Sequence, residues 1–118
     1  MHTVLESIGT ANPPFKRSQP EAVRFMSQVE GFSAPMRNRI ESIYAHSGID
    51  HRYSCLADYG LEPEQFEFYP KNWSLQPFPT TEVRNRTYQD CAGAIAESAA
   101  QQALWHAGRE AAEITHLI

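Results

Sequence analysis

The sequence predicts an α/β protein in which strands and helices form layers. The first observation is a short apolar segment, residues 3–8, that ends in strong turn chemistry. The second is a pair of capped helical patterns followed by a strand-like segment at 49–56. The third is a long Ala-rich helical pattern at 82–107 that leads into another apolar segment at 114–118. Strands that alternate with helices along the chain are typical of layered α/β folds.

Composition and charge exclude several classes of protein. The chain has 118 residues, of which 42% are hydrophobic and 20% are charged, as in globular domains rather than disordered segments. The net charge of -4 argues against nucleic-acid binding, which usually depends on a basic face. No leader pattern and no apolar run of transmembrane length occur, so we expect a cytoplasmic protein. Cys55 and Cys91 are too few for a disulfide framework, and the His residues are too scattered for a metal cluster.

The first expected element is a short strand at 3–8, where apolar residues alternate loosely with polar ones. A run of Gly, Asn and two Pro residues follows at 9–14. Proline fixes its own φ and pushes the residue before it out of the helical region. We therefore predict a rigid turn directly after this strand.

Two helices and a second strand are expected next. The first helix covers 20–29, with a Pro in its first turn. Ser33 is placed to cap the second helix, which runs to about Ser47. Gly48 stands where a left-handed residue commonly ends a helix, and the strand at 49–56 follows it.

Residues 57–80 are the least regular part of the chain. Four prolines, Pro63, Pro70, Pro77 and Pro79, exclude a long helix there. Aromatic residues are nevertheless frequent, and disordered linkers are poor in them. The aromatic residues of this loop are Tyr59, Phe66, Phe68, Tyr69, Trp73 and Phe78. We expect an ordered loop that packs on the rest of the protein or on a partner subunit, rather than one that contacts substrate.

The longest expected element is a helix at 82–107, capped by Thr80 or Thr81 and ended by Gly108. Its second half is rich in small residues, which let a helix lie close to a sheet or to another helix. The apolar segment 114–118 is expected to be a buried strand that ends abruptly. An unpaired apolar strand leaves hydrogen-bonding groups without partners, so we expect the chain to be the front part of a larger domain.

Three motifs, taken in order and spacing, resemble a known family. They are IGTANPP at 8–14, SGIDHRY at 47–53, and the long Ala-rich helix that ends in ITHLI at 114–118. Together they resemble the N-terminal segment of type III polyketide synthases, the chalcone-synthase family. The segments PFPTT at 77–81 and RNRTY at 84–88 resemble the microbial members more than the plant ones.

The resemblance implies the N-terminal part of a thiolase-like αβαβα fold, incomplete in this chain, and a homodimer in the full-length protein. It implies an acyltransferase that condenses an acyl thioester starter with malonyl-CoA units by decarboxylative Claisen chemistry. The family's catalytic Cys, His and Asn would lie outside this chain, so the 118 residues alone are expected to be inactive. Beyond these thioester substrates no cofactor is expected, and an acyl carrier protein is an alternative donor of the starter.

The resemblance also implies a binding site for the phosphates of CoA on the helix before Gly48. The family's basic positions fall here on Arg39, Ser42 and His46. Residues spaced by three and then four share one helix face, and the guanidinium fork suits a phosphate. Ser42 and His46 depart from the basic pattern, which predicts weaker CoA binding than in plant relatives. The competing interpretation is that Arg39 is an ordinary solvated charge.

Two other functions stay open. The chain could be complete as a non-catalytic module for dimer formation or for docking of a carrier protein. Alternatively, the protein could be a condensing enzyme closer to ketoacyl synthase III or to hydroxymethylglutaryl-CoA synthase. The SGIDHRY segment has counterparts in those relatives, whereas the loop at 9–14 favours the type III branch.

Overall fold

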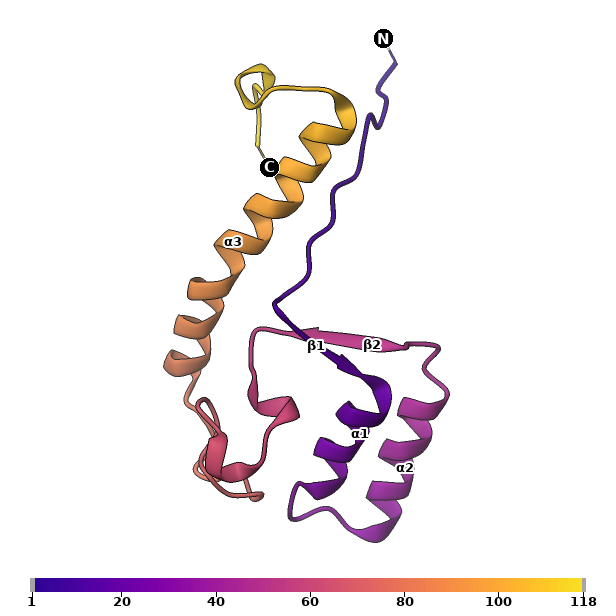
Figure 1. Cartoon of the computed structure of the whole chain (residues 1–118), viewed down its shortest axis with the longest axis vertical. Coiled ribbons are helices and arrows are strands. Elements are labelled where there is room, and N and C mark those ends of the chain that lie inside the picture. Colours follow the sequence, from indigo (N-terminus) through magenta and orange to yellow (C-terminus); the bar gives the residue numbers. More distant parts are fainter. Residues whose placement is uncertain (1, 118) are drawn as a thin grey trace. The chain divides into compact units, whose positions relative to one another are not determined.

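The computed structural model describes residues 2–117 and shows a mixed helix and sheet architecture. The chain divides into two compact units, drawn in Figure 1. Residues 13–87 form the helix–hairpin unit. Residues 2–12 and 88–117 are the described part of the second, here called the long-helix unit. None of the helices in residues 2–117 has both the length and the apolar character needed to cross a membrane.

The helix–hairpin unit contains two antiparallel strands with two helices between them in the chain. Strand β1, Phe15–Ser18, pairs with β2, His51–Ser54, so that Phe15 lies opposite Ser54 and Ser18 opposite His51. Helix α1, Gln19–Gln28, follows β1 directly, and α2, Ala34–Ala45, packs beside α1 (Figure 1). The backbone N–H of Gln19 also donates to Asp50 O at 3.0 Å, which ties the start of α1 to the strand pair.

Local capping explains where the two helices begin. Ser18 and Glu21 form a capping box, in which the Glu21 carboxylate accepts from the Ser18 backbone N–H at 2.8 Å. The Ser33 side chain accepts from the backbone N–H of Met36 at 3.4 Å. Gly48 adopts a φ of +65° after α2, in the left-handed region that glycine tolerates. The predicted helices are confirmed, although α2 ends two residues earlier than expected.

The core of this unit is aromatic and joins α1 to the irregular loop. Phe25 of α1 is 4% exposed and Phe66 of the loop is 2% exposed. Trp73 packs edge-on against both, with ring centroids 5.5 Å from each. The loop contains two short 3₁₀ turns, Asp58–Gly60 and Pro63–Gln65. The prediction of an ordered loop that packs on the protein is therefore confirmed.

A buried carboxylate holds the loop in shape. Asp58 is 1% exposed, and its oxygens accept three backbone hydrogen bonds. The donors are the N–H groups of Glu67 at 3.2 Å, Phe68 at 3.0 Å and Tyr69 at 2.8 Å. A carboxylate can accept several bonds at once, so one side chain orders three successive residues.

A pair of hydroxyl groups adds to the same loop. The Tyr59 and Tyr69 hydroxyl oxygens lie 2.9 Å apart. Burial, followed by this hydrogen bond, raises the pKa of Tyr59 far above its ordinary value. Tyr59 is therefore a neutral packing and hydrogen-bonding group rather than an acid or base.

The long-helix unit is built from one helix and from residues 2–12, an extended segment here called the strap. Helix α3, Thr81–Ala107, begins in the neighbouring unit, where Thr80 Oγ1 accepts from Val83 N at 3.3 Å. It ends at Gly108, whose φ is +63°, as the sequence predicted. Residues 2–12 run along the second half of α3 as an extended segment, visible in Figure 1. Ser7 Oγ donates to Ala103 O at 2.8 Å, which fixes the two side by side.

Close approach of the strap depends on small residues. A Cβ placed on Gly9 would run into the Ala99 carbonyl oxygen and lie 2.5 Å from Ala103 N. Further along, Arg109 donates to both carboxylate oxygens of Glu6, at 3.0 and 3.3 Å. The small side chains of α3 thus admit a neighbouring backbone, as predicted, but the neighbour is the strap and not a sheet.

Three strand predictions need correction. Residues 3–8 are extended but pair with no strand among the described residues, and Leu5 is 79% exposed. Residues 114–117 also form no strand, because Ala111–Glu113 is a 3₁₀ turn and irregular chain follows; Ile118 lies outside the described residues. The strand expected at 49–56 shrinks to His51–Ser54. An apolar pattern specifies a strand only where a partner strand is present to complete the hydrogen-bond ladder.

Candidate functional site

The three residues predicted to bind CoA phosphates lie on α2 and at its end. Arg39 and Ser42 belong to the helix, and His46 is its C-cap residue. All three side chains are exposed. Arg39 and Ser42 are three positions apart and so share one face of the helix, whereas His46 lies just past its last residue.

Hydrogen bonds distinguish what these three groups can do. Within residues 2–117 the Arg39 guanidinium donates no hydrogen bond, so its donors are available to an anion. His46 Nδ1 lies 2.8 Å from Ser42 O. A carbonyl oxygen only accepts, so Nδ1 carries the proton in this contact and Nε2 of the neutral ring is an acceptor. His46 can therefore donate from Nε2 to a phosphate only when the ring is protonated.

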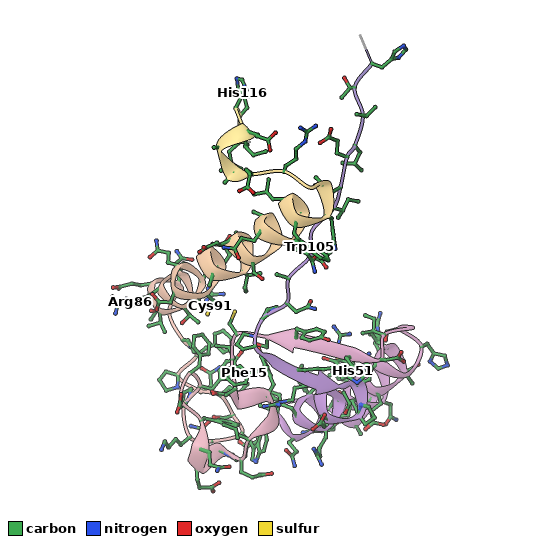
Figure 2. All side chains as sticks on the ribbon, turned by 45° about the horizontal axis from the view of Figure 1, so that its top comes forward. Phe15, His51, Arg86, Cys91, Trp105 and His116 are labelled. Atoms are coloured by element: carbon green, nitrogen blue, oxygen red, sulfur yellow. The ribbon has the colours of Figure 1, made fainter. Side chains whose placement is uncertain are left out.

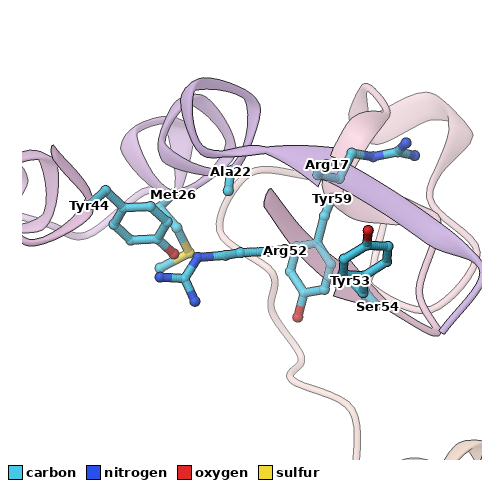
Figure 3. A pocket seen from close by; sticks show the side chains of 8 residues that line it. All are labelled: Arg17, Ala22, Met26, Tyr44, Arg52, Tyr53, Ser54 and Tyr59. Carbon is cyan, nitrogen blue, oxygen red and sulfur yellow. The ribbon is translucent and has the colours of Figure 1, made fainter. Parts of the chain in front are cut away.

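A second site, which sequence reasoning missed, is a cleft in the helix–hairpin unit. Its volume is about 360 Å³, and Figure 3 shows the side chains around it. The wall combines aromatic, apolar and cationic groups with no acidic side chain. The lining residues are Arg17, Ala22, Met26, Tyr44, Arg52, Tyr53, Ser54 and Tyr59.

Arg52 is held in place in this cleft by a chain of side chains. Its Nε donates to Gln19 Oε1 at 2.8 Å. Gln19 Nε2 in turn donates to Ser47 Oγ at 2.6 Å and to Tyr44 O at 3.1 Å. The guanidinium carbon lies 4.7 Å from the centre of the Tyr44 ring, in a cation–π contact visible in Figure 3.

Arg17 lines the same cleft but its guanidinium is committed to the protein. Its Nη1 donates to Lys16 O at 3.1 Å and its Nη2 to Ala57 O at 3.3 Å. Its Nε is buried without a hydrogen-bond partner. A Cβ on Gly60 would lie 2.6 Å from Arg17 Nη2, so the absence of a side chain at Gly60 makes room for the guanidinium. Arg17 acts as a brace between β1 and the loop.

The sequence contained one signal for this cleft. Arg52 and Tyr53 are the last two residues of the SGIDHRY motif. The motif supports the family resemblance, but the sequence alone indicates no chemical role for either residue. Gln19, the residue that orients Arg52, lies 33 positions earlier. No local pattern connects two residues at that separation.

The other candidate groups in the sequence are the cysteines and the possible metal ligands. Cys55 and Cys91 are half-buried and form no disulfide. Among residues 2–117, no group of three or more His, Cys, Asp or Glu side chains could hold a metal ion.

Comparison with known proteins gives one informative similarity. No protein-family profile and no curated protein matches this chain. The chain is similar to the crystal structure of PKS-I from the brown alga Ectocarpus siliculosus, with a TM-score of 0.72 and 26% sequence identity. The similarity covers 91% of this chain and 28% of that one. It supports a relationship to polyketide synthases over the part of the fold that this chain spans.

Proposed function

We propose that this chain is the N-terminal part of a type III polyketide synthase of the microbial branch, with a thiolase-like fold when complete. The observation that carries the proposal is the similarity to PKS-I over nearly the whole chain. The motifs at 8–14 and 47–53 support it independently, because they occur in the order and spacing of that family. Homodimer formation by the full-length protein is part of the proposal.

In the proposed reaction a Cys thiolate takes the acyl group from a starter thioester and releases the carrier thiol. Malonyl-CoA then loses CO₂, and the enolate attacks the enzyme-bound thioester carbonyl. The new carbon–carbon bond forms as the Cys thiolate leaves, while a His and an Asn stabilise the developing oxyanions. These three residues would lie outside the 118 residues, so the chain alone is predicted to be inactive.

The role proposed for α2 is to bind the phosphates of malonyl-CoA. Arg39 supplies an unpaired guanidinium, and the Ser42 hydroxyl lies one turn further along the same face. His46 contributes only when protonated, because its Nδ1 proton is already donated to Ser42 O. Weak phosphate binding fits a starter that arrives on an acyl carrier protein, whose pantetheine arm lacks the nucleotide.

The proposal is tested with the full-length protein, malonyl-CoA and a set of acyl thioester starters. Arg39→Ala is expected to raise the KM for malonyl-CoA about two- to fivefold, which corresponds to the upper part of the range for an ion pair at an exposed site. Arg86→Ala is the matched control, because Arg86 projects from α3 into solvent (Figure 2) and forms an exposed ion pair with Glu82 at 3.1 Å. An unchanged KM in Arg39→Ala would remove Arg39 from the site.

A non-catalytic docking module is the second candidate, and exposed apolar side chains are compatible with it. Leu5, Tyr88 and Trp105 are exposed in the long-helix unit, and Trp105 is 77% exposed. Such side chains suit contact with further polypeptide, either of the same chain or of a partner. Reading the gene beyond residue 118 separates the two candidates. A continuing frame with a Cys in a glycine-flanked motif supports the enzyme, whereas a stop codon supports the module.

A further inference from the structure

We propose that the cleft around Arg52 binds a small planar ligand with one carboxylate, such as an aromatic carboxylic acid. The site is distinct from the face of α2 proposed for CoA, and it uses none of Arg39, Ser42 and His46. The inference goes beyond the proposed function and does not depend on it. The argument rests on the charge of the cleft, the orientation of Arg52, and the size and walls of the cavity.

One of the two arginines that line the cleft has hydrogen-bond donors that the described residues do not use. Of its two arginines, Arg17 is engaged with main-chain oxygens through both terminal nitrogens. Arg52 uses only Nε, and within residues 2–117 its Nη1 and Nη2 donate no hydrogen bond. No acidic side chain lines the cleft to neutralise the charge. The uncompensated guanidinium therefore selects for an anion.

The free end of Arg52 matches the geometry of a carboxylate. Two parallel N–H groups of a guanidinium can donate to the two oxygens of one carboxylate. Because Gln19 holds Nε at 2.8 Å and Tyr44 packs against the guanidinium plane, this end is oriented before a ligand arrives. A preorganised donor loses less conformational entropy on binding than a mobile surface arginine does.

The walls of the cleft favour a flat apolar body behind the carboxylate. Tyr44 and Tyr53 provide aromatic surfaces, and Ala22 and Met26 of α1 provide apolar contact. The volume of about 360 Å³ falls at the lower end of the range for small-molecule sites. Among the described residues that line the cleft, Arg52 is the cation with unused donors, and one guanidinium suits a single carboxylate better than the several charges of a nucleotide.

The hydroxyl of Ser54 adds a second polar contact within the cleft. Its oxygen accepts from Leu56 N at 2.9 Å, which leaves its proton to donate. A hydroxyl or carbonyl group on the ligand ring would satisfy it. The cleft thus favours an aromatic acid that carries a further oxygen substituent over a bare hydrocarbon acid.

The first test compares two ligands that differ only in charge, bound to the unaltered protein. The probes are 2-naphthoate and its neutral counterpart 2-naphthamide, titrated by calorimetry and by ¹H–¹⁵N NMR. Loss of one charge-assisted interaction is expected to weaken binding of the amide by about tenfold or more. The amide signals of Arg52, Tyr53 and Ser54 are expected to shift with 2-naphthoate. The amide signals of the residues around Arg39 on α2 are expected not to shift.

The second test uses a pair of matched variants. Arg52→Gln removes the guanidinium and is expected to weaken 2-naphthoate binding about tenfold or more. Arg86→Gln removes an exposed arginine outside both proposed sites and is expected to leave the affinity within about twofold. Equal binding of the two probes, shifts centred on Arg39, or no binding of 2-naphthoate would each overturn the proposal. The comparison of 2-naphthoate with 2-naphthamide uses the unaltered protein, so it tests the proposal even if Arg52→Gln fails to fold.

Discussion

Asp58→Asn is the substitution that most sharply tests how the loop is held. The Asp58 side chain is 1% exposed and accepts three backbone hydrogen bonds. Asn can keep its one carbonyl oxygen towards Phe68 and Tyr69, but its amide nitrogen then faces the Glu67 N–H. The buried amide nitrogen at position 58 then finds no acceptor, the Glu67 N–H loses its own, and the two remaining bonds lose their charge. An unsatisfied buried donor alone costs about 1–3 kcal/mol, so we expect the helix–hairpin unit to lose about 2–4 kcal/mol of unfolding free energy.

Tryptophan fluorescence provides the assay. Trp73 lies in the aromatic core of the helix–hairpin unit, whereas Trp105 lies exposed in the other unit. Urea unfolding of a Trp105→Phe background therefore reports the helix–hairpin unit alone. Asp50→Asn is the matched control, because Asp50 is exposed and its side chain makes no hydrogen bond within residues 2–117. If Asp58→Asn shifts the urea midpoint no more than Asp50→Asn does, the three-bond account of the loop is wrong.

Three further predictions follow from local contacts. Gly9→Ala is expected to release the strap from α3, because the added Cβ would clash with the Ala99 carbonyl oxygen. Faster hydrogen exchange of the backbone amides near Ala103 would show this release. The hydrogen bonds from Ser18 lower the pKa of Glu21. The capping interaction between Glu21 and Ser18 therefore stabilises α1 fully above pH 4.5 and is lost as pH falls through the lowered pKa of Glu21. Glu21→Gln should flatten that acid dependence in circular dichroism. The long-helix unit has no buried residue among 2–12 and 88–117, so its amides should exchange faster than those around Phe25.

The helices could be predicted from sequence because their signals are local. Ser33 caps α2, and Gly48 and Gly108 adopt the positive φ that their positions suggested. Each of these roles depends on neighbours within about four residues, so a linear reading finds them. The order of the aromatic loop was also predictable, since its composition is unlike that of a disordered linker.

The strands could not be predicted to the same degree, because a strand exists only through its partner. Residues 3–8 have an apolar strand pattern, yet among residues 2–117 they pair with no strand, and Ser7 instead hydrogen-bonds to Ala103 of α3. The observed strand β1 has the polar sequence of Phe15–Ser18 and pairs with β2, where Ser18 lies opposite His51, 33 positions further along the chain. Hydrogen-bond pairing, and not side-chain pattern, decided which segment became a strand.

The two candidate sites also differ in how far the sequence predicts them. Helical spacing predicts that Arg39 and Ser42 share one face of α2, whereas the contact of His46 Nδ1 with Ser42 O is visible only in the structure. The Arg52 cleft depends on Gln19, which reaches it from another element. Three-dimensional contacts of this kind leave no trace in sequence spacing.

The most direct test of the central claim is the fate of malonyl-CoA in the presence of the full-length protein. With an acyl thioester starter we expect release of CO₂ together with free CoA and an extended polyketide product. Replacement of the predicted nucleophilic Cys beyond residue 118 should abolish product formation. Malonyl-CoA that stays intact with every starter, or a reading frame that stops at residue 118, would contradict the account.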